Sequence, residues 1–88
     1  MKDMCANLGE AAHHLGAEAA AELGRAMLKH APMHSAHEGW AVIYEELDEL
    51  WDEVRAWQPS TNDYSKMRKE AIQVAAMALR FVHDVCDR

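Results

Sequence analysis

The chain has 88 residues, half of them apolar, with only two prolines and four glycines, and this composition is typical of one ordered, mostly helical domain. A domain of this size buries only roughly 60 to 65% of the surface that its unfolded chain exposes, so we expect it to need a partner for stability. The formal charge of −6 argues against nucleic acid or an anionic membrane as that partner, because both are bound by clustered Lys and Arg.

The expected location follows from the cysteines and from the apolar runs. Cys5 and Cys86 lie near opposite ends of the chain, no CxxC pair occurs, and the first residues do not resemble a signal peptide. No run of about 18 apolar residues occurs that would suggest a membrane span. We therefore expect a cytoplasmic protein with reduced cysteines.

Two proline-containing breaks, at residues 31–33 and 58–62, divide the chain into three helical segments. The first segment, residues 1–31, predicts an amphipathic helix from about Asp3 to His30. Its glycines each weaken a helix by up to about 1 kcal/mol relative to Ala, which predicts a bend or split near Gly16. Apolar side chains recur along it at steps of three and four: Met4, Leu8, Ala12, Leu15, Ala19, Leu23 and Met27.

Residues 35–87 predict an antiparallel helical hairpin. Its first helix starts at Ser35, with Glu38 three residues later as in a capping box, and runs to about Trp57. Its second helix runs from about Asp63 to Cys86 and is apolar nearly all round over residues 71–82, which favours burial on several sides. A seam at three- and four-residue steps predicts contact between the first of these helices and a neighbouring helix: Trp40, Ile43, Leu47, Leu50, Val54 and Trp57.

The predicted fold is therefore all-α, a helical hairpin plus an N-terminal helix in one domain spanning residues 1–88. A homodimer or homotetramer would complete a four-helix-bundle-like core and cover the apolar third segment.

Carboxylates mark a candidate site on the hairpin. Glu46 and Glu49 share a helical face, and Glu70 and Gln73 repeat the same spacing on the next helix. Acidic residues opposite an apolar stripe are usually a solvated surface, but Glu70 falls on an apolar face, where a charge needs a partner. That partner would be a salt bridge to Lys66 or Arg80, or a divalent cation. Oxygen ligands suit Mg²⁺ or Mn²⁺, which also bind phosphates.

These residues resemble the MazG-like all-α nucleoside triphosphate pyrophosphohydrolases, which are related to the dimeric dUTPases. Their signature is EExxE, followed after roughly a dozen to just under thirty residues by ExxD. Residues 45–49 read EELDE, and EAIQ follows at residues 70–73 after 20 intervening residues. Gln73 therefore stands where the family has Asp. The resemblance covers about residues 35–85.

The resemblance implies that water cleaves a (d)NTP between its α- and β-phosphates, giving a nucleoside monophosphate and pyrophosphate. Glu46, Glu49 and Glu70, with Gln73, would hold Mg²⁺, or Mn²⁺ in its place. Glu45 would be a nearby ligand or would orient or deprotonate the attacking water, which makes Glu45, Glu46 and Glu49 the candidate catalytic residues. The candidate substrate-binding residues are Lys66, Lys69 and Arg80 for the phosphates, and His37 and Trp40 beside the nucleotide.

Other interpretations of the same residues remain open. His30, His34 and His37 are spaced as on a helix, but Pro32 interrupts them and no zinc motif occurs, which disfavours a zinc site. Because an amide oxygen supplies no charge, Gln73 favours an inactive relative that binds metal or nucleotide. The heptad-like seam and the small size favour a structural interaction module.

Overall fold

The computed structural model describes residues 2–88, with side chains described from Asn7 onward, so Met4 and Cys5 lie outside the described side chains. Cys86 is exposed and carries a free thiol. The described residues contain no strand, which confirms the all-α class. The elements are α1 (Lys2–Lys29), α2 (Ala36–Ala56), the 3-10 turn η1 (Pro59–Thr61), α3 (Ser65–Phe81) and the π-helical turn η2 (Val82–Cys86).

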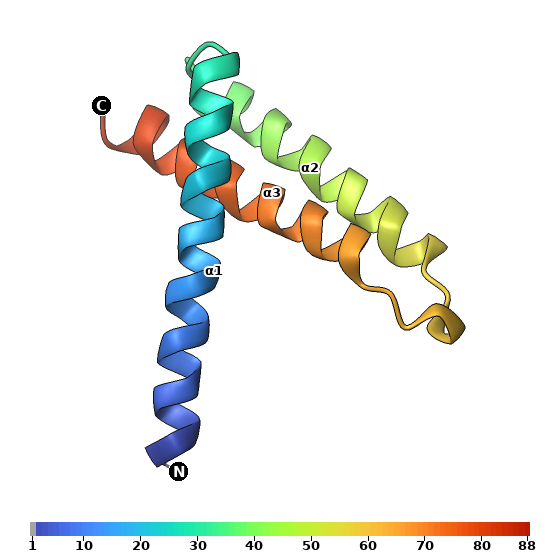
Figure 1. The fold of residues 1–88 in the computed structure, drawn as a ribbon. Helices are drawn as coiled ribbons and strands as arrows, with labels where there is room; N and C mark the ends of the chain where they lie inside the picture. The colour runs from blue at the N-terminus through green and yellow to red at the C-terminus, as the bar shows by residue number, and fades with distance from the viewer. Residues whose placement is uncertain (1) are drawn as a thin grey trace.

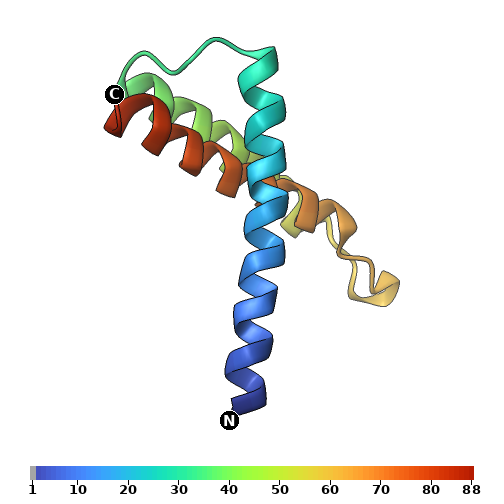
Figure 2. The ribbon, with the colours of Figure 1, turned by 60° about the vertical axis from the view of Figure 1, so that its left-hand side comes forward.

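The predicted hairpin is confirmed, with α2 and α3 running antiparallel (Figure 1). Helix α1 crosses α3, while its N-terminal half extends away from the hairpin (Figures 1 and 2). Its packing is against α3 and not along α2. The segment from α1 to α2 passes over the end of the hairpin that holds the C-terminus (Figure 2). No helix in residues 2–88 is long and apolar enough to cross a membrane.

The boundaries of α2 follow from local hydrogen bonds. Ser35 has extended backbone angles, and its hydroxyl accepts from the Glu38 amide at 3.1 Å, which confirms the predicted N-cap. The Glu38 carboxylate accepts in turn from the His34 amide at 3.0 Å, one residue before the usual capping-box position. At the other end, Pro59 starts η1 and Asn62 takes a left-handed conformation with φ 49°, which turns the chain into α3.

The predicted split of α1 near Gly16 is wrong, because the helix is continuous from Lys2 to Lys29. Gly16 costs only about 1 kcal/mol relative to Ala, and it lies among Ala, Glu and Leu, which are good helix formers. No atom outside the helix lies within 4 Å of the position that a Cβ on Gly16 would occupy. The glycine is therefore tolerated without any packing requirement.

The core of a single copy is small. Met33, Ala76 and Met77 are its buried centre, and partly buried side chains from all three α-helices pack around them. Gly39 allows α2 to approach α3 closely, because a Cβ there would lie 2.5 Å from Cδ2 of Phe81. The buried centre gathers where the α1–α2 segment meets α3.

A buried ion pair fixes that segment. Arg80 and Asp84 lie one turn apart, and Nε of Arg80 donates to Oδ2 of Asp84 at 3.1 Å. Arg80 also donates to the carbonyl oxygens of His30, at 3.2 Å, and Ala31, while Asp84 accepts from the Met33 amide at 3.0 Å. We call Arg80, Asp84 and the backbone of residues 30–33 the linker clamp.

Every charged group of the linker clamp has partners. His83 lies 2.7 Å from the second oxygen of Asp84, and these contacts hold the pKa of Asp84 down at about 2, with the hydrogen bond from His83 as the largest cause and the Met33 amide next. Arg80 is only 4% exposed. The prediction that Arg80 binds substrate phosphates is therefore corrected, because its buried guanidinium already donates to Asp84 and to the carbonyl oxygens of His30 and Ala31.

Candidate metal centre

Glu46 and Glu49 on α2 meet Glu70 on α3, with one carboxylate oxygen of each within 4.8 Å of the others. The two α2 residues share a face because they are three apart, and the antiparallel hairpin brings α3 opposite them. We call these three residues the carboxylate cluster. Oxygens around one Mg²⁺ lie about 3 to 4 Å apart, given ligand distances of about 2.1 Å. Small side-chain movements would therefore suffice to grip one ion.

Glu46 has a buried carboxylate oxygen without a hydrogen-bond partner. Its side chain is half-buried, and Oε2 is fully shielded without a hydrogen-bond partner. Several causes together raise the pKa of Glu46 to about 7: burial is the largest, the charge of Glu49 and a side-chain hydrogen bond with it come next, and the charges of Glu70 and Glu45 follow. A carboxylate in this position is stabilised either by a proton or by a cation.

Glu70 responds in the same direction. Burial raises its pKa, as does the charge of Glu49, while Lys69 lowers it and Glu53 raises it. Glu53 was not among the predicted site residues. It lies one turn beyond Glu49, at a half-buried position of α2. Its four-residue spacing from Glu49 is the sequence signal that could have placed it beside the cluster. Glu45 is exposed, and it adds only its charge to the cluster.

The salt-bridge interpretation of Glu70 is not what the structure shows. Among the ion pairs of the described residues, none involves Glu46, Glu49 or Glu70. Arg80 belongs to the linker clamp. Lys66 lies near the η1 turn, where its charge acts on Asp63. The cluster therefore keeps a local excess of negative charge.

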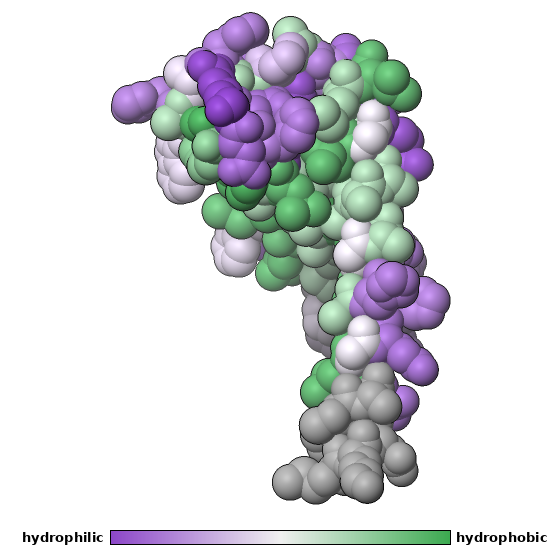
Figure 3. All heavy atoms as spheres, turned by 90° about the vertical axis from the view of Figure 1, so that its left-hand side faces the viewer, coloured by the Kyte–Doolittle hydropathy of each residue, from purple (hydrophilic) through white to green (hydrophobic). Residues whose placement is uncertain are grey.

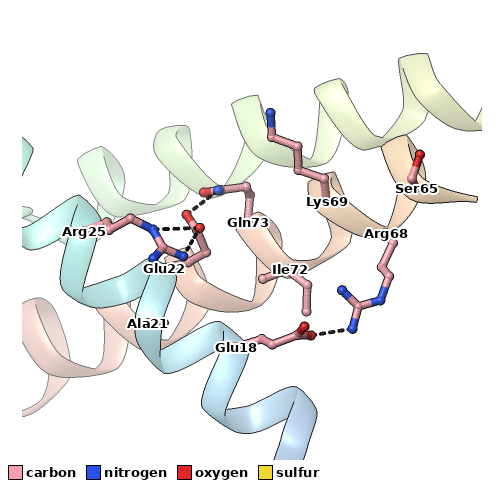
Figure 4. A pocket seen from close by; sticks show the side chains of 9 residues that line it. All are labelled: Glu18, Ala21, Glu22, Arg25, Ser65, Arg68, Lys69, Ile72 and Gln73. Atoms are coloured by element: carbon pink, nitrogen blue, oxygen red, sulfur yellow. Dashed lines mark hydrogen bonds and ion pairs between the residues drawn. The ribbon is translucent and has the colours of Figure 1, made fainter.

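Gln73, predicted as a further ligand, bonds a carboxylate on α1 instead. Its amide nitrogen donates to Oε2 of Glu22 at 2.5 Å, and Figure 4 shows the side chain turned toward α1. Glu22 also accepts from Nε of Arg25 at 2.9 Å, and the pKa of Glu22 is lowered, first by Arg25 and then by Gln73. The structure thus corrects the orientation expected for Gln73.

A cleft of about 350 Å³ lies between α1 and α3 beside this contact (Figure 4). Arg25 and Arg68 line it, and each is paired with an α1 carboxylate, Glu22 and Glu18 respectively. Lys69 also lines the cleft, and its charge reaches Glu70 on the cluster side. Of the predicted phosphate-binding residues, Lys69 is thus the one placed beside the carboxylate cluster. Arg25 and Arg68 were missed, because their position depends on how α1 crosses α3.

The structure separates His37 and Trp40 from the carboxylate cluster. Both line a shallow hollow in the first turns of α2. At 1.5 Å per residue, Trp40 lies about 9 Å and His37 about 14 Å from Glu46 along the helix axis. Trp40 is exposed and points about a third of a turn away from Glu46. The prediction that they border the same nucleotide pocket is not supported within one copy.

The histidines gather no metal-ligating group. Within the described residues, the carboxylate cluster is the one set of three or more His, Cys, Asp or Glu side chains whose ligand atoms converge.

Comparison with known proteins identified no relative of this chain. No protein-family model matches the chain, and neither a curated protein nor a solved structure does.

Proposed function

We propose that this protein is a Mg²⁺-dependent nucleoside triphosphate pyrophosphohydrolase that converts a (d)NTP and water into a (d)NMP and pyrophosphate. The proposal rests on the carboxylate cluster together with the resemblance of residues 45–49 and 70–73 to the MazG-like signature. The substrate is an anion, and an acidic site can bind it only if a cation lies between them.

The half-buried Glu46 is the single observation that carries the proposal. Its Oε2 is shielded from solvent and lacks a hydrogen-bond partner, and its carboxylate converges with those of Glu49 and Glu70. A solvated acidic surface would leave each carboxylate exposed to water. A structural ion pair would supply an Arg or Lys, as the linker clamp does for Asp84. A divalent cation is the partner that three converging carboxylates fit.

Each residue then has a defined task. Glu46, Glu49 and Glu70 hold Mg²⁺, which would supply positive charge to the phosphate oxygens. Lys69, beside the cluster, meets a phosphate oxygen from the α1 side. Glu45 is exposed on the adjacent face, where it orients the attacking water and accepts its proton.

A second candidate is an inactive relative that binds metal or nucleotide without hydrolysis. Gln73 favours it, because the position that carries Asp in the MazG-like signature is here a neutral amide bonded to Glu22. Three carboxylates still bind a cation, but fewer charges lower the affinity for a second one.

One assay distinguishes these functions. The purified chain is incubated with each dNTP and NTP in Mg²⁺ or Mn²⁺, and monophosphate and pyrophosphate are measured. The enzyme hypothesis predicts turnover that Glu49→Gln and Glu70→Gln each reduce at least about a hundredfold, by analogy with losing a metal ligand or its support. Glu10→Gln is the matched control, because the same change is made on exposed α1.

The outcomes are separable. No turnover, together with thermal stabilisation by Mn²⁺ that both cluster variants abolish, supports the inactive relative. If the chain shows no turnover and Mn²⁺ does not stabilise it, both candidate functions are contradicted.

A further inference from the structure

Gln73 lies at the border between two sides of α3. At about 100° per residue, it is about 60° from Glu70, which belongs to the carboxylate cluster, and about 40° from Lys69, which lines the cleft beside α1. The side chain of Gln73 is half-buried. Because it lies between the two directions, this side chain can turn toward the carboxylate cluster or toward α1.

In the structure Gln73 turns toward α1. Its amide nitrogen donates to Oε2 of Glu22 at 2.5 Å (Figure 4). The other oxygen of Glu22 accepts from Nε of Arg25 at 2.9 Å. A hydrogen bond to a charged acceptor is stronger than one to a neutral acceptor, so the Glu22 carboxylate fixes the amide on the α1 side of α3.

The same amide is within reach of the carboxylate cluster. Residues three apart on a helix have Cβ atoms about 5 to 6 Å apart, and a glutamine side chain is long enough to cover that distance. A cation bound to Glu70 is therefore accessible to Oε1 of Gln73 once the amide turns away from Glu22. Carbonyl oxygens are among the ligands that suit Mg²⁺ and Mn²⁺.

We propose that Glu22 is a positioning residue that holds Gln73 out of the metal centre, so that this contact between α1 and α3 sets the number of protein ligands. The inference rests on the proposed function, because it requires a cation at the carboxylate cluster. While the contact is intact, the three carboxylates alone hold the cation. When the contact is broken, Gln73 adds its carbonyl oxygen as a further ligand and the affinity rises.

The contact can be broken without detaching α1. Leu23 and Ala26 of α1 pack against the buried centre, and Ala19 is buried as well. Figure 3 shows α1 on the right and hydrophobic surface on the hairpin to its left. Apolar packing therefore keeps α1 in place when the single hydrogen bond between Glu22 and Gln73 is lost.

The test is the Mn²⁺ affinity of the full chain, measured by electron paramagnetic resonance for a double-mutant cycle. Glu22→Ala should tighten Mn²⁺ binding at least about threefold. Electrostatics alone gives the opposite sign, because the variant removes a negative charge that attracts the cation. Gln73→Ala should leave the affinity within about twofold of the unmodified chain, and Glu22→Ala should give no gain in the Gln73→Ala background.

Glu18→Ala is the matched control. Glu18 lies one turn before Glu22 on α1 and pairs with Arg68 of α3. The control variant therefore removes the same charge and one contact between α1 and α3, but it leaves Gln73 bonded, so it should not tighten Mn²⁺ binding. Alanine is a good helix former, and circular dichroism checks that each variant keeps its helix content.

Unchanged or weaker binding in Glu22→Ala would overturn the inference, as would a gain that persists without Gln73 or that Glu18→Ala reproduces. Each of these outcomes leaves the proposed metal site standing, because the unmodified chain still binds Mn²⁺. Absence of Mn²⁺ binding in the unmodified chain and in every variant would instead overturn the proposed metal site, and the inference with it.

Discussion

The linker clamp and the carboxylate cluster each contain acidic side chains that are partly or fully buried, but the pKa values of these acids are shifted in opposite directions. Asp84 is surrounded by Arg80, His83 and the Met33 amide, and its pKa is held at about 2. Glu46 faces Glu49 and Glu70, and its pKa is raised to about 7. A carboxylate whose hydrogen-bond and ion-pair partners all come from the protein itself has a structural role. A carboxylate surrounded by other carboxylates is instead free to bind a cationic ligand.

The largest expected effect comes from breaking the clamp. Arg80→Ala leaves the carboxylate of Asp84 buried without its cation and releases the carbonyl oxygens of His30 and Ala31. Removing one partner of a buried pair costs about 3 to 5 kcal/mol. Chemical denaturation should show this loss. Arg55→Ala is the control, because its pair with Asp52 is exposed and should cost under about 1 kcal/mol. Equal losses in the two variants would contradict a structural role for the clamp.

A smaller effect is expected where α2 meets the core beside the clamp. In Gly39→Ala the new Cβ would lie 2.5 Å from Phe81 Cδ2 and 3.1 Å from Met33 Sδ, so the helices must separate or Phe81 must move. Overpacking of this kind costs about 1 to 3 kcal/mol. Gly24→Ala, with open space around its Cβ, should instead stabilise by about 1 kcal/mol. Thermal unfolding of both variants measures the contrast, and a stabilised Gly39→Ala would show that the close approach is unimportant.

The smallest effect, and the one opposite in sign to that at the clamp, is expected at the cluster. Glu46→Gln removes a charge that its neighbours repel, so the metal-free variant should be more stable at pH 8 by about 1 kcal/mol, allowing for a half-exposed side chain. Because the folded-state pKa of Glu46 is raised from 4.5 to about 7, the metal-free protein should lose stability as pH rises through that range. The variant should show a smaller loss, because only the raised pKa of Glu70 then remains in the cluster.

The clamp has the opposite pH response. The pKa of Asp84 falls from 3.8 to about 2 on folding, so its contribution is present above about pH 4 and is lost as pH falls toward 2. Unfolding curves across both ranges test the two signs together. A Glu46→Gln variant with the same pH profile as the unmodified chain would contradict the assignment to Glu46.

The sequence predicted what depends on spacing within and between two neighbouring helices. The three-residue step from Glu46 to Glu49 and the short connection to the next helix were enough to place Glu70 opposite them. Arg80 and Gln73 were misassigned because their partners, the carbonyl oxygens of His30 and Ala31 and the carboxylate of Glu22, lie some 50 positions away in the chain. These partners come close only because α1 crosses α3. The crossing is a tertiary contact, and residue spacing within one helix does not predict it.

The same limit explains the α2 seam. Periodicity showed that Trp40, Leu47 and Val54 are apolar and aligned, and this pattern alone predicted contact with a neighbouring helix. It does not identify that helix. In a single copy the residues that pack inward lie about a quarter turn away: Gly39 lies against Phe81 of α3, and Ile43 packs against the buried centre.

The central claim is that the carboxylate cluster binds a divalent cation, and titration of the metal-free protein with Mn²⁺, followed by electron paramagnetic resonance, tests it most directly. We predict at least one site per chain, tighter at pH 8 than at pH 6 because protons compete at Glu46. Glu49→Gln and Glu70→Gln should each weaken it at least about tenfold, whereas Asp48→Asn, on the exposed side of the same helix, should not. Binding that is absent, or that is unchanged in both cluster variants, would contradict the account.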